Sequence, residues 1–362
     1  MENLYKIIFL VSFWVFVALF FIFYDWGILF DPGLLDNSQT KDYELSSVLI
    51  SSMIATIVGG IFIASIEVFY FSKLLRKKPF GLSLLIKTAF YMTNIIFFTS
   101  LSILIGNSLK YEKSIFHDDI VQIYLSYLFS PRLLSIWLLW GFTVILALFI
   151  LQISEKLGQG VLANYLLGKY HRPREEVRIF MFLDLKSSTS LAEQLGHIRY
   201  SLLIQDCFYD LTEVVSKRKA QIYQYVGDEI VLTWKLGPGL RNENCLNIYF
   251  DYDNVLKHKK EYYMDKYGLV PEFKAGLDSG MITVAEVGEI KKELAYHGDV
   301  LNSASRIQAM CNQYQSDVLL SERLKNQFNG YREKGFDLIG EFLLRGKNEA
   351  MNVYRISPEG LH

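Results

Sequence analysis

Cysteine is scarce in this chain, which has only three among its 362 residues, Cys207, Cys245 and Cys311. The number is odd and no two of them follow the Cys-x-x-Cys spacing, which argues against both a disulfide framework and a zinc site. An excess of basic residues is missing as well, because 37 lysines and arginines stand against 38 aspartates and glutamates. With a formal net charge of -1, the composition gives no indication of a nucleic-acid partner.

Charged residues are absent from four long apolar stretches within the first 153 residues. Each is close to the roughly 20 residues that a helix needs to cross a bilayer. No small-residue cleavage pattern follows the first stretch, so a membrane span fits better there than a cleaved signal peptide. We therefore expect residues 1–153 to form an α-helical membrane domain in the lipid bilayer, with four transmembrane helices at Ile7 to Tyr24, Leu45 to Ile66, Thr88 to Leu109 and Leu133 to Ser154.

The positions of lysine and arginine predict how these helices are oriented. One short loop, between the second and third stretches, holds Lys73, Arg76, Lys77, Lys78 and Lys87. The connections on the other side lean acidic, with Asp31, Asp36, Asp42, Glu44, Asp118 and Asp119. Cytoplasmic loops carry the excess of basic residues. We expect an integral protein of the plasma or inner membrane, with its N-terminus and everything after Ser154 in the cytoplasm. We expect Glu67, at the end of the second stretch, to lie at the membrane interface.

Residues 154–173 are predicted to form a linker, or transducer, helix. Apolar residues recur at helical spacing from Leu157 to Leu166, and the pattern stops at Pro173. This apolar face could pack on the domain that follows or pair with a second copy of the chain.

Strand and helix patterns alternate after residue 174, which predicts an α/β or α+β domain. The nearly continuous apolar run from Val177 to Leu183 is typical of a buried central strand. We expect Phe273 to Val287 to be a strand pair broken at Asp278 to Gly280. Ser187, Ser188 and Thr189 offer hydroxyl groups that could cap a helix.

Two aspartates lie where strands are predicted to end. Asp184 closes the run that begins at Val177, and Asp228 lies in the Gly-Asp turn of a hairpin that spans Gln221 to Trp234. In one sheet these carboxylates could converge and hold two divalent ions around a triphosphate. The helix that follows Leu185 would add the free N–H groups of its first turn, which suit phosphate.

A third group of polar residues lies on a predicted helix near residue 300. Asn302 and Arg306 are four residues apart and therefore share a helix face, so an amide and a guanidinium could reach one anionic substrate. An arginine in that place could stabilise the charge that develops on phosphorus during substitution.

Four motifs, in the same order, resemble those of the class III nucleotidyl cyclases, enzymes that form cyclic AMP or cyclic GMP. They are FLDLKSST at 182–189, YVGDEI at 225–230, GDVLNSASR at 298–306 and RGK at 345–347. The resemblance covers Glu175 to Ile356 and implies a ferredoxin-like α+β catalytic domain over residues 174–362. It further implies a homodimer with shared sites, a nucleoside triphosphate substrate with ATP favoured, and two Mg²⁺ or Mn²⁺ ions per site.

The resemblance also implies roles for individual residues. Asp184 and Asp228 match the metal-binding aspartates, and Leu185 lies beside the first of them. Asn302 and Arg306 match the pair that orients the ribose and stabilises the transition state. Substrate-binding roles fall to Lys186, Ser187, Ser188, Thr189, Gln224, Ala295, Lys347 and, with a looser match, Lys291 or Lys292.

Two positions depart from the family pattern. Gln224 stands where adenylate cyclases usually carry a base-selecting lysine, and Ala295 stands where they carry Asp or Thr. Because an amide can pair with either purine and an alanine with neither, a guanylate or other nucleotide cyclase remains an alternative. A membrane sensor that only binds nucleotide is another. A diguanylate cyclase would carry Gly-Gly-Asp-Glu-Phe on its hairpin, whereas Val226 and Ile230 replace its first Gly and its Phe here.

Overall fold

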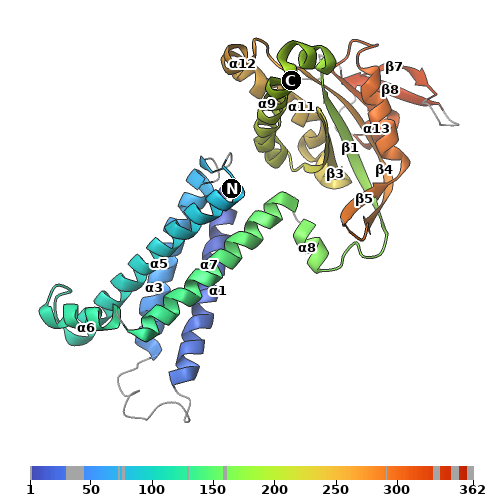
Figure 1. Cartoon of the computed structure of the whole chain (residues 1–362). Helices are drawn as coiled ribbons and strands as arrows, with labels where there is room; N and C mark the ends of the chain where they lie inside the picture. The colour runs from blue at the N-terminus through green and yellow to red at the C-terminus, as the bar shows by residue number, and fades with distance from the viewer. Residues whose placement is uncertain are drawn as a thin grey trace. The chain divides into compact units, whose positions relative to one another are not determined.

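The chain divides into two compact units, Met1–Lys156 and Leu157–His362. A computed structural model describes residues 2–29, 45–71, 74–75, 78–128, 130–157, 161–290, 292–328, 335–343 and 350–356 (Figure 1). The division between the units falls inside the predicted linker. Each unit is described by itself.

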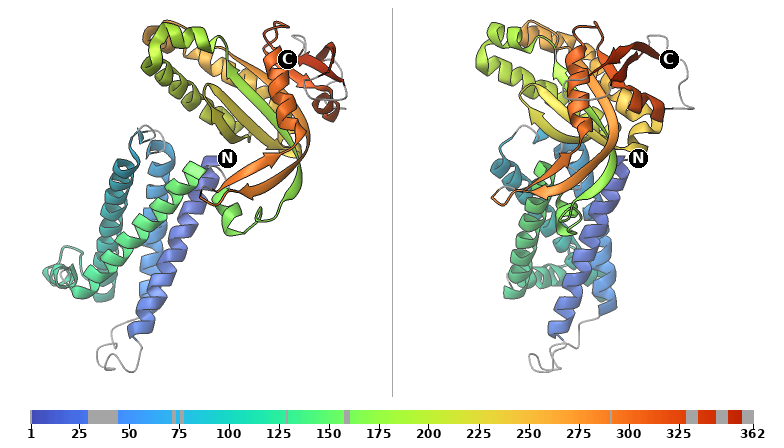
Figure 2. Two further views of the ribbon diagram at one scale, coloured as in Figure 1. Left: turned by 45° about the vertical axis from the view of Figure 1, so that its right-hand side comes forward. Right: turned by 90° about the vertical axis from the view of Figure 1, so that its right-hand side faces the viewer.

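Four long helices make up the first unit: α1 (Glu2–Leu29), α3 (Leu45–Ile66), α5 (Phe80–Tyr111) and α7 (Pro131–Leu157). All four are long and apolar enough to cross a membrane, which confirms four candidate membrane helices. They lie side by side in each view (Figure 2). A π-helical turn, η1 (Glu67–Phe71), extends α3, and the short helix α6 (Asp118–Leu128) follows α5.

An ion pair joins α5 to the π-helical turn η1, and it involves Lys87, whose predicted place in a loop is wrong. Lys87 lies within α5, not in the preceding loop, because this helix begins directly after Pro79. Its ammonium is 2.5 Å from a carboxylate oxygen of Glu67, and the two side chains are only 10% and 17% exposed. The Tyr91 hydroxyl donates to the other oxygen of Glu67 at 3.1 Å. Glu67 is therefore paired and largely buried, and its expected place at the membrane interface stays a prediction.

We expect Lys87→Met to destabilise the first unit by about 3 to 5 kcal/mol, because it leaves the Glu67 carboxylate buried without its counter-ion. The double variant Glu67→Gln/Lys87→Met should recover most of this loss. Equilibrium unfolding of the full chain in mixed micelles measures both. Lys78→Met is the control, since Lys78 is exposed. Equal effects of Lys87→Met and Lys78→Met would show that the ion pair contributes nothing.

The second unit is built on one mixed sheet. The strands are β1 (Arg174–Leu185), β2 (Gln221–Val226), β3 (Glu229–Lys235), β4 (Phe273–Val287), β5 (Glu293–His297), β6 (Val318–Ser321), β7 (Phe336–Phe342) and β8 (Met351–Ile356). Their order is β2-β3-β1-β4-β6-β8-β7, and β5 pairs with β4 outside this path. β1 is antiparallel to both β3 and β4, whereas β4 and β6 are parallel.

Helices cover both faces of this sheet, as Figure 1 shows, and the combination confirms the predicted α/β class. The longer helices are α9 (Ser188–Lys217), α11 (Asn244–His258), α12 (Lys260–Tyr267) and α13 (Asp299–Met310); the shorter ones are α8 (Val161–Leu166), α10 (Leu236–Leu240), η2 (Arg241–Glu243) and α14 (Glu322–Gln327). Alternate residues of β1 serve the two faces. Met181 and Leu183 pack in the core that α9 and α11 share, and Phe180 packs with Val300 and Ala304 of α13.

β4 is one continuous strand, so the predicted break at Asp278 to Gly280 is wrong. Gly280 is needed there because α13 lies close: a Cβ atom at this position would come 2.9 Å from Val300. Asp278 is fully buried and pairs with Arg323. Residues that usually mark a turn thus have packing and charge-pairing roles inside a strand.

The short helix α8 packs on the rest of the second unit. Of the two alternatives for the linker, this favours packing on the following domain over pairing with a second copy of the chain. The Tyr165 hydroxyl donates to the carbonyl oxygen of Lys292 at 3.3 Å. A little further on, the Glu286 N–H donates to the carbonyl oxygen of Tyr170 at 3.0 Å.

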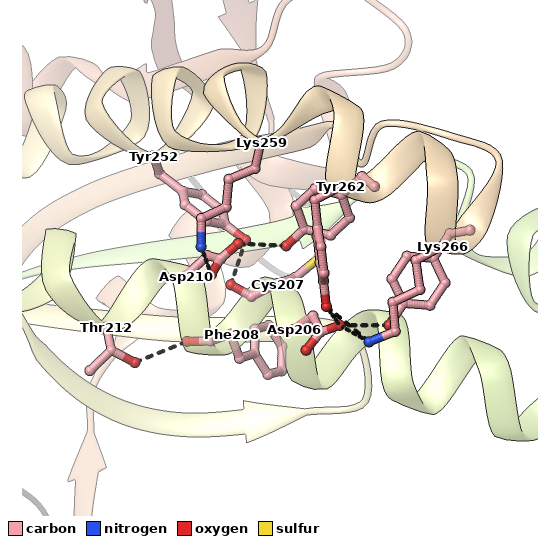
Figure 3. A network of polar contacts seen from close by, with 11 residues as sticks. Asp206, Cys207, Phe208, Asp210, Thr212, Tyr252, Lys259, Tyr262 and Lys266 are labelled. Carbon is pink, nitrogen blue, oxygen red and sulfur yellow. Dashed lines mark hydrogen bonds and ion pairs between the residues drawn. The ribbon is translucent and has the colours of Figure 1, made fainter. Parts of the chain in front are cut away.

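Two aspartates of α9 hold the following helices by polar contacts (Figure 3). Asp206 accepts hydrogen bonds from Tyr262 at 2.6 Å, Lys266 at 2.6 Å and Tyr267 at 2.7 Å. Asp210 accepts one from Lys259 at 2.6 Å and one from Tyr263 at 2.8 Å.

Asp206→Asn should lower the stability of the second unit by about 1 to 3 kcal/mol, because three donors lose a buried charged acceptor. In a unit of this size, that corresponds to a fall of about 5 °C in its thermal midpoint, measured in the full chain. Asp265→Asn, on the exposed side of α12, is the matched control. A midpoint for Asp206→Asn within a degree of the control would refute the prediction.

Candidate active site

The sheet register brings Asp184 and Asp228 to the same edge. β1 and β3 are antiparallel with Asp184 opposite Glu229, and Asp228 lies in the turn immediately before Glu229. Gly227 has a φ of +64°, a conformation that glycine adopts without strain, and this lets the turn present Asp228. Three carboxylates therefore lie close together at the end of β1.

The electrostatics of these carboxylates suit a divalent cation. Burial raises the pKa of Asp184, and the charge of Asp228 raises it further, while Lys274 opposes the shift. Burial, followed by the charges of Asp184 and Asp228, raises the pKa of Glu229 to about 7. The pKa values of Asp184 and Glu229 are thus raised despite the nearby Lys274 ammonium, and a bound divalent cation would favour the ionised form of both carboxylates.

The donor set is small. Among the described residues, no three His, Cys, Asp or Glu side chains gather in a way that could hold a metal ion on their own. Mg²⁺ is usually held by one or two carboxylates, with water and substrate phosphate as the other ligands. The residues present therefore fit an ion that arrives with a phosphorylated substrate.

Lys274 and Gln308 contact Asp184, and neither was identified from the sequence. Lys274 lies opposite Asp184 on β4, is 9% exposed, and places its ammonium 3.4 Å from a carboxylate oxygen. The Gln308 amide, on α13, donates to the same oxygen at 2.9 Å. A lysine between the apolar residues Phe273 and Ala275 was the available signal for Lys274.

The segment after β1 differs from expectation in part. Ser187 precedes α9 with a φ of +56° and makes no capping hydrogen bond through its side chain, so the predicted cap is absent there. Ser188 and Thr189 lie in the first turn of α9. The Leu185 side chain is buried in the core, which leaves only its carbonyl oxygen to face an ion. The Lys186 ammonium is 2.5 Å from Asp317 and 3.3 Å from Glu272.

Asn302 and Arg306 lie on α13, one turn apart. Asn302 is exposed and Arg306 is half-buried. Within the described part of the chain, neither side chain forms an ion pair or a hydrogen bond with another residue. Gln308, further along the same helix, is the residue of α13 that bonds to Asp184. Within one chain, the Gln308 side chain therefore connects Asp184 to the helix that carries Asn302 and Arg306. Gln308 itself was in neither group of predicted site residues.

The other residues that were predicted to bind substrate lie on or beside different strands of the sheet, or outside the described residues. Gln224 is exposed on β2, just after a register shift, and lies opposite Val231. Ala295 lies on β5 opposite Ala285. Lys292 pairs with Glu286 at 2.8 Å. Lys291 and Lys347 lie outside the described residues.

Comparison with known proteins agrees with this architecture. The family model for the adenylate and guanylate cyclase catalytic domain matches residues 169–358, just over half of the chain. The chain belongs to this family. This membership favours a class III cyclase domain over the alternative of a diguanylate cyclase.

Individual relatives are more distant. The chain is 30% identical over 214 residues to adenylate cyclase 2 of Rhizobium meliloti (strain 1021), which is 59% of each protein. It is 25% identical over 184 residues to an adenylate cyclase of Anabaena cylindrica, covering 49% of this chain and 36% of that one. The chain thus spans less than two thirds of either relative. The structure of a bacterial light-regulated adenylyl cyclase shares the fold, with a TM-score of 0.51 and 18% identity over 63% of this chain and 65% of that one.

Proposed function

We propose that the second unit converts a nucleoside triphosphate, with ATP preferred, into the 3′,5′-cyclic nucleotide and pyrophosphate. The observation that carries this proposal is the carboxylate pair of Asp184 and Asp228 with the Lys274 ammonium beside it, in a unit of the cyclase family. The relatives named above are adenylate cyclases, which supports ATP.

In the proposed mechanism, Asp184 and Asp228 would hold two divalent ions, whose charge would lower the pKa of the ribose 3′-hydroxyl and offset the charge of the pyrophosphate leaving group. Lys274 and Lys347 contact the phosphates. Asn302 orients the ribose. Arg306 stabilises the negative charge that develops when the 3′-oxygen attacks the α-phosphorus in line.

We further propose a head-to-tail homodimer, in which Asp184 and Asp228 of one chain meet Asn302 and Arg306 of the other. Asn302 and Arg306 have no side-chain partner among the described residues, which supports this arrangement. Residues 1–153 then anchor the protein in the membrane with its N-terminus in the cytoplasm. Residues 154–173 connect the anchor to the catalytic residues 174–362.

Gln224 and Ala295 favour a second candidate, a cyclase that accepts GTP or more than one base. An exposed amide on β2 can donate to one purine and accept from another. With alanine at the second position, base selection loses the carboxylate or hydroxyl that would enforce it.

The experiment that tests the function incubates the solubilised full-length protein with each of the four ribonucleoside triphosphates and Mn²⁺. Cyclic products are identified by mass, and a parallel reaction with a chelator is the control. We expect cyclic AMP from ATP. Cyclic GMP as the main product would support the second candidate. Nucleotide binding without any product would identify a sensor, and a cyclic dinucleotide would overturn the proposal.

A further inference from the structure

Helix α13 contacts Asp184 and also carries Asn302 and Arg306. The contact is made by Gln308, which is 6% exposed and donates from its amide nitrogen to an oxygen of Asp184 at 2.9 Å. Gln308 lies two residues after Arg306, on the same 12-residue helix. One element therefore links a predicted metal ligand to the predicted transition-state residues.

This helix is held against β4 so closely that it has little freedom to bend. A Cβ atom at Gly276 would come 2.2 Å from the backbone nitrogen of Gln308. At the other end of α13, Arg323 pairs with the buried Asp278 of β4 and lies 3.6 Å from Asp299, the first residue of the helix. Packed elements of this kind respond to a displacement at one end as a body, because the interior is close-packed.

The contact between Gln308 and Asp184 matters for catalysis only in the head-to-tail dimer, so the inference rests on the proposed function. There, Asp184 of a chain serves one active site, while Asn302 and Arg306 of the same chain serve the other. We infer that Gln308 is a positioning residue that couples the two active sites of the dimer. It fixes one oxygen of Asp184 in the first site, and it ties that oxygen to the helix that presents Arg306 to the second.

A dimer with a single live site separates this coupling from a local effect. One chain carries Asp228→Ala and the other Arg306→Ala, and different affinity tags select the mixed dimer. The live site then has its aspartates from the Arg306→Ala chain and its arginine from the Asp228→Ala chain. Gln308→Leu is placed in one chain at a time. In one dimer it is in the chain that supplies the aspartates of the live site, and in the other it is in the chain that supplies the arginine.

We expect different results from the two placements. In the Arg306→Ala chain, Gln308→Leu loosens the live Asp184 and raises the Mn²⁺ concentration for half-maximal rate about fivefold. In the Asp228→Ala chain, it leaves that concentration unchanged and lowers kcat about fivefold, through Arg306. Gln313→Leu, an exposed glutamine just beyond α13, is the matched control and should change neither quantity. An unchanged kcat in the second placement would overturn the coupling.

A second measurement needs no turnover. Hydrogen exchange of residues 299–310 is followed in the otherwise unmodified full-length protein, without nucleotide, before and after Mn²⁺ is added. We expect Mn²⁺ to change exchange along α13, and Gln308→Leu or Gln308→Met to remove this response. An equal response in wild type and both variants would overturn the inference. If the mixed dimer without a Gln308 change is inactive, the shared-site function fails, and the exchange result still decides whether Asp184 and α13 are coupled.

Discussion

Asp228→Ala is expected to reduce cyclic nucleotide formation by a factor on the order of 10³ or more, with protein level and folding retained. The variant removes one of the two carboxylates that are proposed to hold the metal ions. Asp184 remains, but its oxygen is already shared between Lys274 and Gln308. The measurement is cyclic product by mass at saturating ATP and Mn²⁺, in membranes or micelles that contain the full-length protein.

Loss of activity has to be separated from loss of structure. Asp228 lies in a turn and is not part of the hydrophobic core, so the thermal midpoint of the second unit without metal should stay close to that of the wild type. Added Mn²⁺ with ATP should raise the midpoint of the wild type but not that of the variant. Asp265→Ala, at an exposed position of α12, should retain full activity. A variant at Asp228 with more than a tenth of wild-type turnover would mean that this carboxylate is not a required metal ligand.

The features predicted well from the sequence are those encoded locally. Four uninterrupted apolar stretches predict four candidate membrane helices, because bilayer thickness sets the length that such a helix needs. Local sequence also predicts two elements of the sheet. The apolar run from Val177 to Leu183 predicts β1, and the Gly-Asp turn at Asp228 predicts the β2–β3 hairpin. The third helix begins at Phe80 rather than at Thr88, and Lys87 within it pairs with Glu67, 20 residues earlier, a contact that the local sequence does not reveal.

The features that were missed depend on register between distant segments. Lys274 lies beside Asp184 only because β1 and β4 align Asp184 with Lys274 across the sheet. Nothing in the sequence near either residue sets that alignment. The same holds for Gln308, which reaches Asp184 because Gly276 allows α13 to lie directly on β4. Lys186, in contrast, lies in a recognisable motif, yet its ammonium pairs with Asp317 and Glu272.

The second large effect is a recovery of activity. Asp228→Ala and Arg306→Ala chains, each inactive alone, are expected to regain activity when they are expressed together. In a head-to-tail dimer, one site of the mixed pair combines the intact aspartates of one chain with the intact Asn302 and Arg306 of the other. The opposite site collects both defects. A mixed dimer should therefore show about half of the wild-type turnover. A sample assembled at random from equal amounts of the two chains should show about a quarter, because about half of its dimers are mixed.

The arrangement of residues in one chain makes this test decisive. If one chain supplied all four residues to its own site, every dimer would contain two dead sites, and mixing could recover nothing. Two Asp228→Ala chains with different tags are the control, because they form dimers but cannot assemble an intact site. Product formation is measured on dimers purified through both tags, so the assembly of mixed dimers is known before activity is assayed. Purified mixed dimers without turnover would refute the shared site, whereas turnover near half of wild type would require that Asp228 and Arg306 of different chains meet at one substrate.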